Sequence, residues 1–203
     1  MSVKSLFPTQ VYAAPLQRSH AREFNRRLLR ECQQIRVDDA AGRRWSAKSY
    51  PGGYTSYGSL SRLHRQTPGF AELERRLARH VRRYADALEF DLTGRELVMT
   101  DCWINIMGHQ TVHSLHLHPL STISGTYYVQ VPRGSPGIKF EDPRLDRFMA
   151  APPRRADAAA QGWVTVAAQP GAVVLFESWL RHEVVPNPSQ QERVSVSFNY
   201  SWF

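Results

Sequence analysis

The residues from 193 to 202 alternate between polar and apolar side chains, and this pattern constrains the fold more than any other stretch of the chain. Successive side chains of a β-strand point to opposite faces of a sheet, so the pattern predicts a strand with one apolar and one polar face. The apolar positions are Val194, Val196, Phe198, Tyr200 and Trp202, and the polar positions between them are Ser195, Ser197, Asn199 and Ser201.

Seven further segments after residue 96 have the composition of short strands, each bounded by Gly, Pro, Asn or Ser. About eight short strands separated by turn residues predict two packed sheets, as in a jelly roll or a cupin-like double sheet. The seven segments cover residues 97–106, the histidine-rich stretch 113–118, and residues 123–131, 138–140, 163–167, 173–176 and 183–185.

The first half of the chain predicts two helices that support one sheet. One begins at Ser19, a good N-cap residue, and runs to about Ile35. The other is opened by Thr67 or Pro68 and covers about residues 70–88. Both carry apolar side chains at helical spacing, which predicts packing against a core. The fold class expected is mainly β, with a jelly-roll core and two N-terminal helices.

Two other N-terminal segments are predicted to lack helix. Residues 6–15 should be extended, because Pro8 and Pro15 exclude a helix there. Residues 37–61 are rich in Gly, Ser, Tyr, Asp and Pro, which predicts mostly loop. Within that loop, the stretch from Gly53 to Gly58 is either a wall or lid of a substrate site or a plain surface excursion.

Length and composition favour one globular domain. The 203 residues are 42% hydrophobic and 11% aromatic, which suffices for one substantial core. We expect a single domain over residues 1–203, with helical and loop support in 1–96 and the β core in 97–203. No stretch is apolar enough to span a bilayer and the N-terminus lacks a signal-peptide pattern, so a cytoplasmic protein is expected. Cys32 and Cys102 form no disulfide or zinc-finger pattern.

The net charge of +8 raises the question of nucleic-acid binding. Only three of the 26 basic side chains are lysines. The arginines lie mainly on the two predicted helices, where a solvated helix face explains them. Nucleic acid and membrane are therefore not expected partners, whereas an anionic substrate or a protein partner, including a second copy in a homodimer, stays open.

Histidine is concentrated in one place, because four of the eight histidines fall between His109 and His118. On a strand, His116 and His118 would point to one face and the neighbouring leucines to the other. Imidazole suits iron, zinc, copper or nickel, and His182 is the obvious third ligand. By itself a His-x-His pair is more often a hydrogen-bonded structural pair than a metal site, so the surrounding motifs have to decide.

The motifs around the histidines resemble, in their order, the double-stranded β-helix core of the Fe(II)- and 2-oxoglutarate-dependent oxygenases. The resemblance covers about residues 103–203. It extends over nearly the whole chain through the segments 6–8, 53–58 and 140–144, which are similar to those of a bacterial group of 2OG-Fe(II) oxygenases that is largely uncharacterised. The core motifs are His116-x-His118, Ser124-Gly-Thr-Tyr-Tyr-Val129, Gly137-Ile-Lys-Phe140, Pro170-Gly-Ala-Val-Val-Leu-Phe176, His182-Glu-Val184 and Arg193-x-Ser195.

The resemblance implies that two residues of one strand and a distal histidine occupy one face of iron. His116 and His182 match the two histidine ligands of the family. The family usually has Asp or Glu two residues after the first histidine, but this chain has His118 there, so a three-histidine site is expected. Such a site is more positive by one charge than the usual triad. Asp142 is the alternative third ligand, on a different strand or turn.

The resemblance also implies which side chains would contact 2-oxoglutarate. Arg193 would bind its distal carboxylate, because a guanidinium can form two parallel hydrogen bonds to that group. Ser195 would face the same carboxylate, and Tyr128, Ser124 and Asn105 are further candidates. The alternatives are a surface salt bridge for Arg193 and a core position for Tyr128.

Two other histidines are expected to be loop residues or to support the ligands. They are His109 and His113, and His113 should lie on the strand face opposite to His116.

The resemblance therefore implies an Fe(II)- and 2-oxoglutarate-dependent dioxygenase that uses O2, releases succinate and CO2, and hydroxylates a small-molecule or peptide substrate. Two alternatives stay open. One is a three-histidine cupin-like dioxygenase that does not use 2-oxoglutarate and so does not need Arg193. The other is a metal-binding or sugar-binding β-sandwich module without catalysis.

Overall fold

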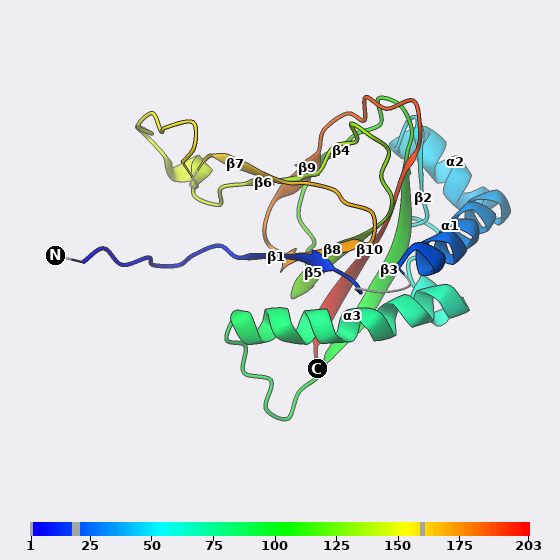
Figure 1. Ribbon diagram of the computed structural model, residues 1–203, viewed down its shortest axis with the longest axis horizontal. Helices are drawn as coiled ribbons and strands as arrows, with labels where there is room; N and C mark the ends of the chain where they lie inside the picture. The colour runs from blue at the N-terminus through cyan, green and yellow to red at the C-terminus, as the bar shows by residue number, and fades with distance from the viewer. Residues whose placement is uncertain (1, 18–20, 159–160) are drawn as a thin grey trace.

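The computed structural model describes residues 2–17, 21–158 and 161–203, whose strands form two antiparallel sheets (Figure 1). The sheets pack face to face as a jelly roll, as the strand pattern predicts. The larger sheet has the order β1 (Val11–Pro15), β8 (Ala172–Glu177), β5 (Ile123–Gln130), β10 (Arg193–Trp202), β3 (Leu97–Met107) and β2 (Gly53–Thr55). The smaller sheet has the order β4 (His113–His116), β9 (His182–Val184), β6 (Ile138–Glu141) and β7 (Trp163–Val166).

Strand β10 divides the molecule into an apolar and a polar layer. It pairs with β3 on one side and with β5 on the other. The apolar positions of its alternating sequence, such as Val194 and Phe198, are buried in the main core. The polar positions, such as Arg193 and Ser195, line a pocket between the two sheets. The alternation predicted from the sequence therefore places polar groups inside the jelly roll.

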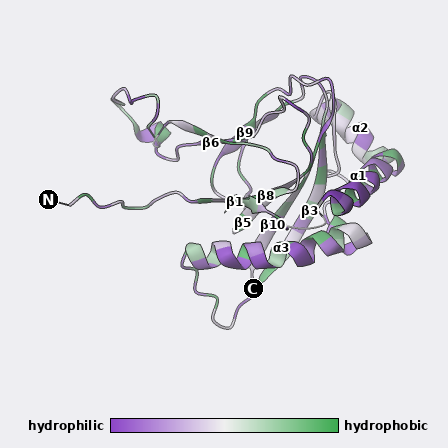
Figure 2. Cartoon of the chain, viewed as in Figure 1, coloured by the Kyte–Doolittle hydropathy of each residue, from purple (hydrophilic) through white to green (hydrophobic). Residues whose placement is uncertain are grey.

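Helices α1 (Ala21–Asp38) and α3 (Pro68–Ala87) pack on the apolar face of the larger sheet (Figure 1). Phe24 and Leu28 of α1 and Phe70 and Leu73 of α3 are buried in the same core as the strands. Figure 2 shows hydrophilic and hydrophobic residues alternating along both helices, as expected when one face meets a core and the other meets water. None of the helices in the described residues is long and apolar enough to cross a membrane.

The prediction of a loop over residues 37–61 is wrong for its first part, because residues 40–49 form helix α2 (Ala40–Ser49). The carboxylate of Asp39 caps this helix by accepting a hydrogen bond from the backbone N–H of Gly42 at 2.8 Å. The residues that α2 buries are Gly42, which has no side chain, and Ser46, whose side chain is polar. The helix therefore has no apolar stripe that a search for hydrophobic periodicity could detect.

The other elements agree with the sequence pattern to within a few residues. The first helix ends at Asp38 instead of Ile35, and the second begins at Pro68. The proposed N-cap Ser19 lies outside the described residues. The extended segment 6–15 contributes β1, which pairs with β8. Residues 53–55 form β2, which pairs with β3, so the stretch 53–58 begins as an edge strand. Two short 3-10 helices cover Leu63–Arg65 and Leu145–Arg147.

Candidate active site

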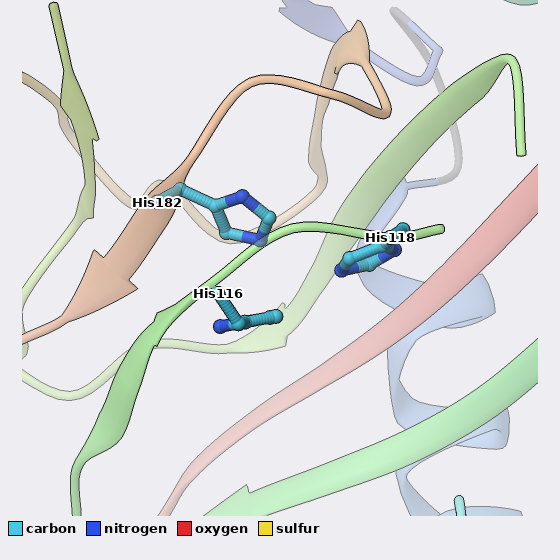
Figure 3. Close-up of side chains that lie close together, drawn as sticks. All are labelled: His116, His118 and His182. Carbon is cyan, nitrogen blue, oxygen red and sulfur yellow. The ribbon is translucent and has the colours of Figure 1, made fainter. Parts of the chain in front are cut away.

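Three histidine side chains meet between the two sheets (Figure 3). His116, the last residue of β4, pairs in register with His182, the first residue of β9. One ring nitrogen of each of these two and of His118 lies within 4.8 Å of the others. The ring centroids are 4.3 Å apart for His116 and His182, and 5.1 Å apart for His118 and His182. After small ring rotations the three nitrogens are near enough to share one ion, since metal–imidazole bonds are about 2.1 Å long.

The route by which these rings converge differs from the one predicted. Strand β4 ends at His116, so His118 lies beyond the strand and not on the same strand face as His116. The backbone N–H of His118 donates to the carbonyl of Ser178 at 3.0 Å. The prediction that His113 faces away from His116 is also wrong. The pairing register shifts between them, so that both line one pocket. Pairing between β4 and β9, together with the turn after β4, brings the imidazoles together.

In all three rings, Nδ1 lies within hydrogen-bonding distance of an oxygen that can only accept. Nδ1 therefore carries the proton, and Nε2 keeps the lone pair that binds a metal. Acceptors at Nδ1 are the usual supports of metal-binding histidines. The pairs are His116 with the Ser114 carbonyl at 2.7 Å, His182 with the Leu180 carbonyl at 2.9 Å, and His118 with Oδ1 of Asn199 at 2.6 Å.

Burial keeps the three rings uncharged. Loss of solvation is the main cause that lowers the pKa of His182 to about 3 and the pKa of His118 to about 4. It also lowers the pKa of His116. Near neutral pH all three rings are therefore neutral, which is the state in which imidazole binds a metal.

The histidines open onto a pocket of about 60 Å³ whose lining also includes Arg193. This side chain is only 2% exposed. Its Nη1 lies 3.2 Å from Sδ of Met107 and 3.5 Å from Oγ of Ser195. Its Nε has no hydrogen-bond partner, and none of the ion pairs among the described residues includes it. A buried cation without a counter-charge is costly, so this pocket is suited to an anion.

A second buried donor faces the same pocket. The hydroxyl of Tyr128 has no hydrogen-bond partner among the described residues. The ring of Tyr128 lies against Arg193, with the guanidinium carbon 4.9 Å from the ring centroid. Burial raises the pKa of Tyr128, so its hydroxyl keeps its proton and can donate it to a ligand.

The sequence of this β core matches a known family. Residues 101–199 match the model of a family described as "Putative 2OG-Fe(II) oxygenase". The matched range holds His116, His118, His182 and Arg193. The β core of this chain is therefore similar in sequence to the 2OG-Fe(II) oxygenases.

Solved structures show that the fold is also shared. HygX from Streptomyces hygroscopicus, solved with nickel, 2-oxoglutarate and hygromycin B bound, is 16% identical with a TM-score of 0.63, over 95% of this chain and 83% of that one. A Pseudomonas putida prolyl-4-hydroxylase is 16% identical with a TM-score of 0.61, over 95% and 92% of the two chains. The α-ketoglutarate-dependent epimerase SnoN from nogalamycin biosynthesis is 15% identical with a TM-score of 0.63, over 95% and 76%.

One further solved structure matches a smaller part of this chain. This chain spans 58% of the length of an oxidoreductase of the 2OG-Fe(II) oxygenase family from Burkholderia pseudomallei, at 19% identity and a TM-score of 0.49 over 66% of this chain. No curated protein matches the sequence.

Asn105 and Ser195, two predicted candidates for co-substrate contacts, line the pocket. Both polar atoms of the Asn105 amide can form hydrogen bonds with neighbouring side chains. The nitrogen donates to Oγ1 of Thr55 at 2.8 Å. The oxygen accepts from Oγ of Ser197 at 2.9 Å and from Nε1 of Trp103 at 3.3 Å. Asn105 therefore shapes the pocket wall without an unpaired polar atom of its own.

Three other residues singled out from the sequence lie outside the pocket. Ser124 does not line the pocket, because its hydroxyl contacts Nδ1 of His118 at 3.0 Å and Oγ of Ser178 at 2.7 Å. Its role as a co-substrate contact is therefore corrected to support of a histidine. Asp142 forms an ion pair with Arg144 at 2.8 Å and does not belong to the histidine cluster. His109 is exposed and lies 3.3 Å from Gln190.

Sequence reasoning missed two residues that contact the histidines of this site. Asn199 accepts the hydrogen bond from His118, and Tyr50 stacks on His113 with ring centroids 4.6 Å apart. Asn199 could have been found, because it lies on the polar face of the alternating strand that also carries Arg193. Tyr50 carries no such signal, because it lies just after the helix that the sequence did not reveal.

Proposed function

We propose that this protein is an Fe(II)- and 2-oxoglutarate-dependent dioxygenase that hydroxylates an organic substrate. The observation that carries the proposal is the buried Arg193, which has no carboxylate partner in the described chain and lines the same pocket as three neutral imidazoles. A metal-binding triad alone would fit many proteins. The added anion site is what a dicarboxylate co-substrate needs.

The residues present fit these cofactors. His116, His118 and His182 would hold the ion through Nε2 and leave its other positions for the co-substrate and O2. Arg193 would form paired hydrogen bonds with the distal carboxylate, assisted by the hydroxyls of Ser195 and Tyr128. When bound, Fe(II) with 2-oxoglutarate and O2 supplies the oxidation, which converts a substrate C–H to C–OH and releases succinate and CO2.

Charge supports a dianionic co-substrate. Three neutral ligands leave both positive charges of Fe(II) uncompensated, and Arg193 adds a third within the same pocket. None of the residues that line this pocket is an Asp or a Glu. A dicarboxylate bound between the ion and Arg193 would reduce this buried charge from +3 to +1, which favours its binding in a site of low dielectric.

The apolar lining would separate the reaction from bulk water. Ile138, Phe176 and Val184 line the pocket beside the histidines, and Phe176 makes an edge-to-face contact with His182 at 4.6 Å. Such a lining strengthens electrostatic interactions within the site and limits competing reactions with solvent.

The test is formation of succinate from 2-oxoglutarate with added Fe(II) and O2. We expect iron-dependent turnover in the wild type and at least about a hundredfold less in His116→Ala and in His182→Ala. Arg193→Gln should raise KM for 2-oxoglutarate by about tenfold or more. His109→Ala, at an exposed histidine outside the pocket, is the matched control and should behave as the wild type. Absence of iron-dependent succinate formation would refute the proposal.

A three-histidine dioxygenase that does not use 2-oxoglutarate is the second candidate. The observation in its favour is His118, which stands where the family usually has a carboxylate and belongs to the cluster. Oxygen consumption with a substrate but without 2-oxoglutarate, unaffected by Arg193→Ala, would support this candidate. Stoichiometric metal binding without any oxygen consumption would instead support a non-catalytic module.

A further inference from the structure

A second cavity of about 420 Å³ shares His113, His116 and His118 with the pocket but does not include Arg193. We call it the aromatic cleft. Its size is in the range of small-molecule binding sites, whereas the pocket beside Arg193 is far smaller. The large side chains that line the cleft are Trp45, Tyr50, Tyr57, Trp103, Val112 and Leu117.

Aromatic rings connect the mouth of this cleft with the histidine cluster. Tyr57 and Trp103 make an edge-to-face contact with ring centroids 5.1 Å apart, and Trp103 lies 5.7 Å from His118. Trp45 of α2 belongs to the same cleft and packs near the backbone of Gly58. A ring placed against these side chains would therefore lie close to the candidate metal site.

The mouth of the cleft exposes much apolar surface. Trp45 is 41% exposed, Tyr57 54%, Val112 44% and Leu117 40%. These residues come from three separate segments of the chain, yet they line one cavity. Apolar side chains gathered around a cavity mark a site whose occupant removes them from water.

The cleft contains no charged side chain, because its histidines are neutral near neutral pH. None of its lining residues is Asp, Glu, Lys or Arg, although these types make up 22% of the chain and the net charge is +8. An ionised group that entered the cleft would lose water without gaining a counter-charge from the side chains that line it. The hydroxyls of Ser49, Thr55 and Ser114 offer a few hydrogen bonds, which are sufficient for a neutral polar group.

We propose that the aromatic cleft binds the substrate to be hydroxylated, and that the part of the substrate inside it is uncharged and carries an apolar ring that stacks on Trp45 and Tyr57. This inference rests on the proposed oxygenase function for the fate of the ligand. The chemical selectivity of the cleft does not depend on turnover. Trp45 and Tyr57 are therefore assigned as specificity-determining residues, which touch substrate away from the metal.

The first experiment uses the neutral, aromatic fluorescent probe N-phenyl-1-naphthylamine. Trp45→Ala and Tyr57→Ala should each weaken its binding about fivefold, the effect of losing one aromatic stacking contact. Trp179→Ala is the matched control, because Trp179 is 46% exposed and lines neither cavity. Circular dichroism verifies that each variant is folded. If Trp45→Ala does not fold, the result for Tyr57→Ala decides the test. Equal affinity in the wild type and in the folded cleft variants, or an equal loss in Trp179→Ala, would overturn the proposal.

The second experiment tests the charge preference with ring-matched competitors. 2-Naphthylmethanol should displace the probe at a concentration about tenfold lower than 2-naphthoate or 2-naphthylmethylamine. The measurement is repeated in Arg193→Gln, so that binding of naphthoate at the guanidinium does not contribute. The positive net charge of the protein would by itself favour binding of the anionic naphthoate over the neutral alcohol. If Arg193→Gln still binds naphthoate more tightly than 2-naphthylmethanol, the proposal is overturned. Neither experiment needs turnover, and failure of the proposed function would appear only as absent succinate formation.

Discussion

Asn199 illustrates how one side chain prepares a candidate metal ligand. It is 7% exposed, and its Oδ1 lies 2.6 Å from Nδ1 of His118 and 2.9 Å from Oγ of Ser124. An acceptor at Nδ1 fixes both the tautomer and the orientation of the ring. His116 and His182 obtain the same support from backbone carbonyls, which a substitution cannot remove. His118 is therefore the ligand whose orientation depends most on another side chain.

Asn199→Ala should weaken metal binding about tenfold, because the ring of His118 loses its acceptor. The measurement is a titration with Co(II) followed by absorbance. Ser197→Ala is the control: Ser197 lies on the same strand face, its hydroxyl is 2.9 Å from the amide of Asn105, and it makes no hydrogen bond with the three histidines in the described chain. Equal Co(II) affinity in the two variants would show that Asn199 does not position His118.

Tyr127 and Tyr128 are adjacent residues with opposite hydrogen-bonding states. The hydroxyl of Tyr127 donates to Oδ1 of Asn25, whereas the hydroxyl of Tyr128 has no partner in the described chain. Tyr127→Phe should destabilise the protein by about 1 kcal/mol, and Tyr128→Phe should leave its stability unchanged or raise it. Urea unfolding measures both effects.

The same pair of variants separates a structural from a functional hydroxyl. Tyr128→Phe should raise KM for 2-oxoglutarate about fivefold through the loss of one hydrogen bond, and Tyr127→Phe should leave it unchanged. An unchanged KM in Tyr128→Phe would remove Tyr128 from the co-substrate site.

At the scale of elements, Asp39 connects the junction between α1 and α2 with residues 54–59, the segment that includes Tyr57 of the aromatic cleft. Its carboxylate caps α2 through Gly42 and accepts hydrogen bonds from the hydroxyls of Tyr54 and Ser59. Asp39→Ala should cost about 3 kcal/mol, because a cap and two further hydrogen bonds are lost. Asp38→Ala, at the neighbouring exposed carboxylate, should cost less than about 0.5 kcal/mol in the same urea experiment.

Asp39 also predicts a dependence of stability on pH. Burial acts to raise the pKa of its carboxyl group, but the hydrogen bonds from Ser59, Gly42 and Tyr54 outweigh it, so the pKa is lowered in the folded protein. A group of this kind stabilises the fold above its unfolded pKa of about 3.9, and the contribution is lost as the pH falls through the folded value. The stability difference between the wild type and Asp39→Asn should therefore shrink as the pH is lowered from about 5 to 3. A constant difference over this range would contradict the assignment.

At the scale of the whole molecule, the candidate metal site joins segments that are far apart in the sequence. His116 and His118 are more than 60 residues from His182, and they meet only because β4 pairs with β9. An ion held by all three would stabilise the folded state alone, since the unfolded chain does not hold the three rings together.

Addition of Ni(II) at about 100 times its Kd should therefore raise the free energy of unfolding by about 2.7 kcal/mol. For a chain of this size the melting temperature should rise by about 5 to 10 °C. His182→Ala should abolish the rise at the same Ni(II) concentration, whereas His109→Ala should retain it. An equal rise in His182→Ala would show that nickel binds at some other place.

The sequence by itself determined the elements whose side chains repeat with a clear period. The alternation in residues 193–202 and the stripes of Phe24 and Phe70 on the two helices predicted β10, α1 and α3, because hydrophobic burial imposes the same period on sequence and structure. The ordered motifs also led to the three histidines and to Arg193. They did not reveal α2, whose buried face is made of Gly42 and Ser46.

Only the tertiary structure decided how the chemical groups meet. The register shift in β4 turned His113 toward the pocket, Ser124 proved to contact His118 instead of lining the pocket, and Asp142 pairs with Arg144. The aromatic cleft likewise combines Trp45 with residues far along the chain. These contacts depend on strand pairing and on the packing of segments distant in sequence, and neither leaves a local pattern in the order of the residues.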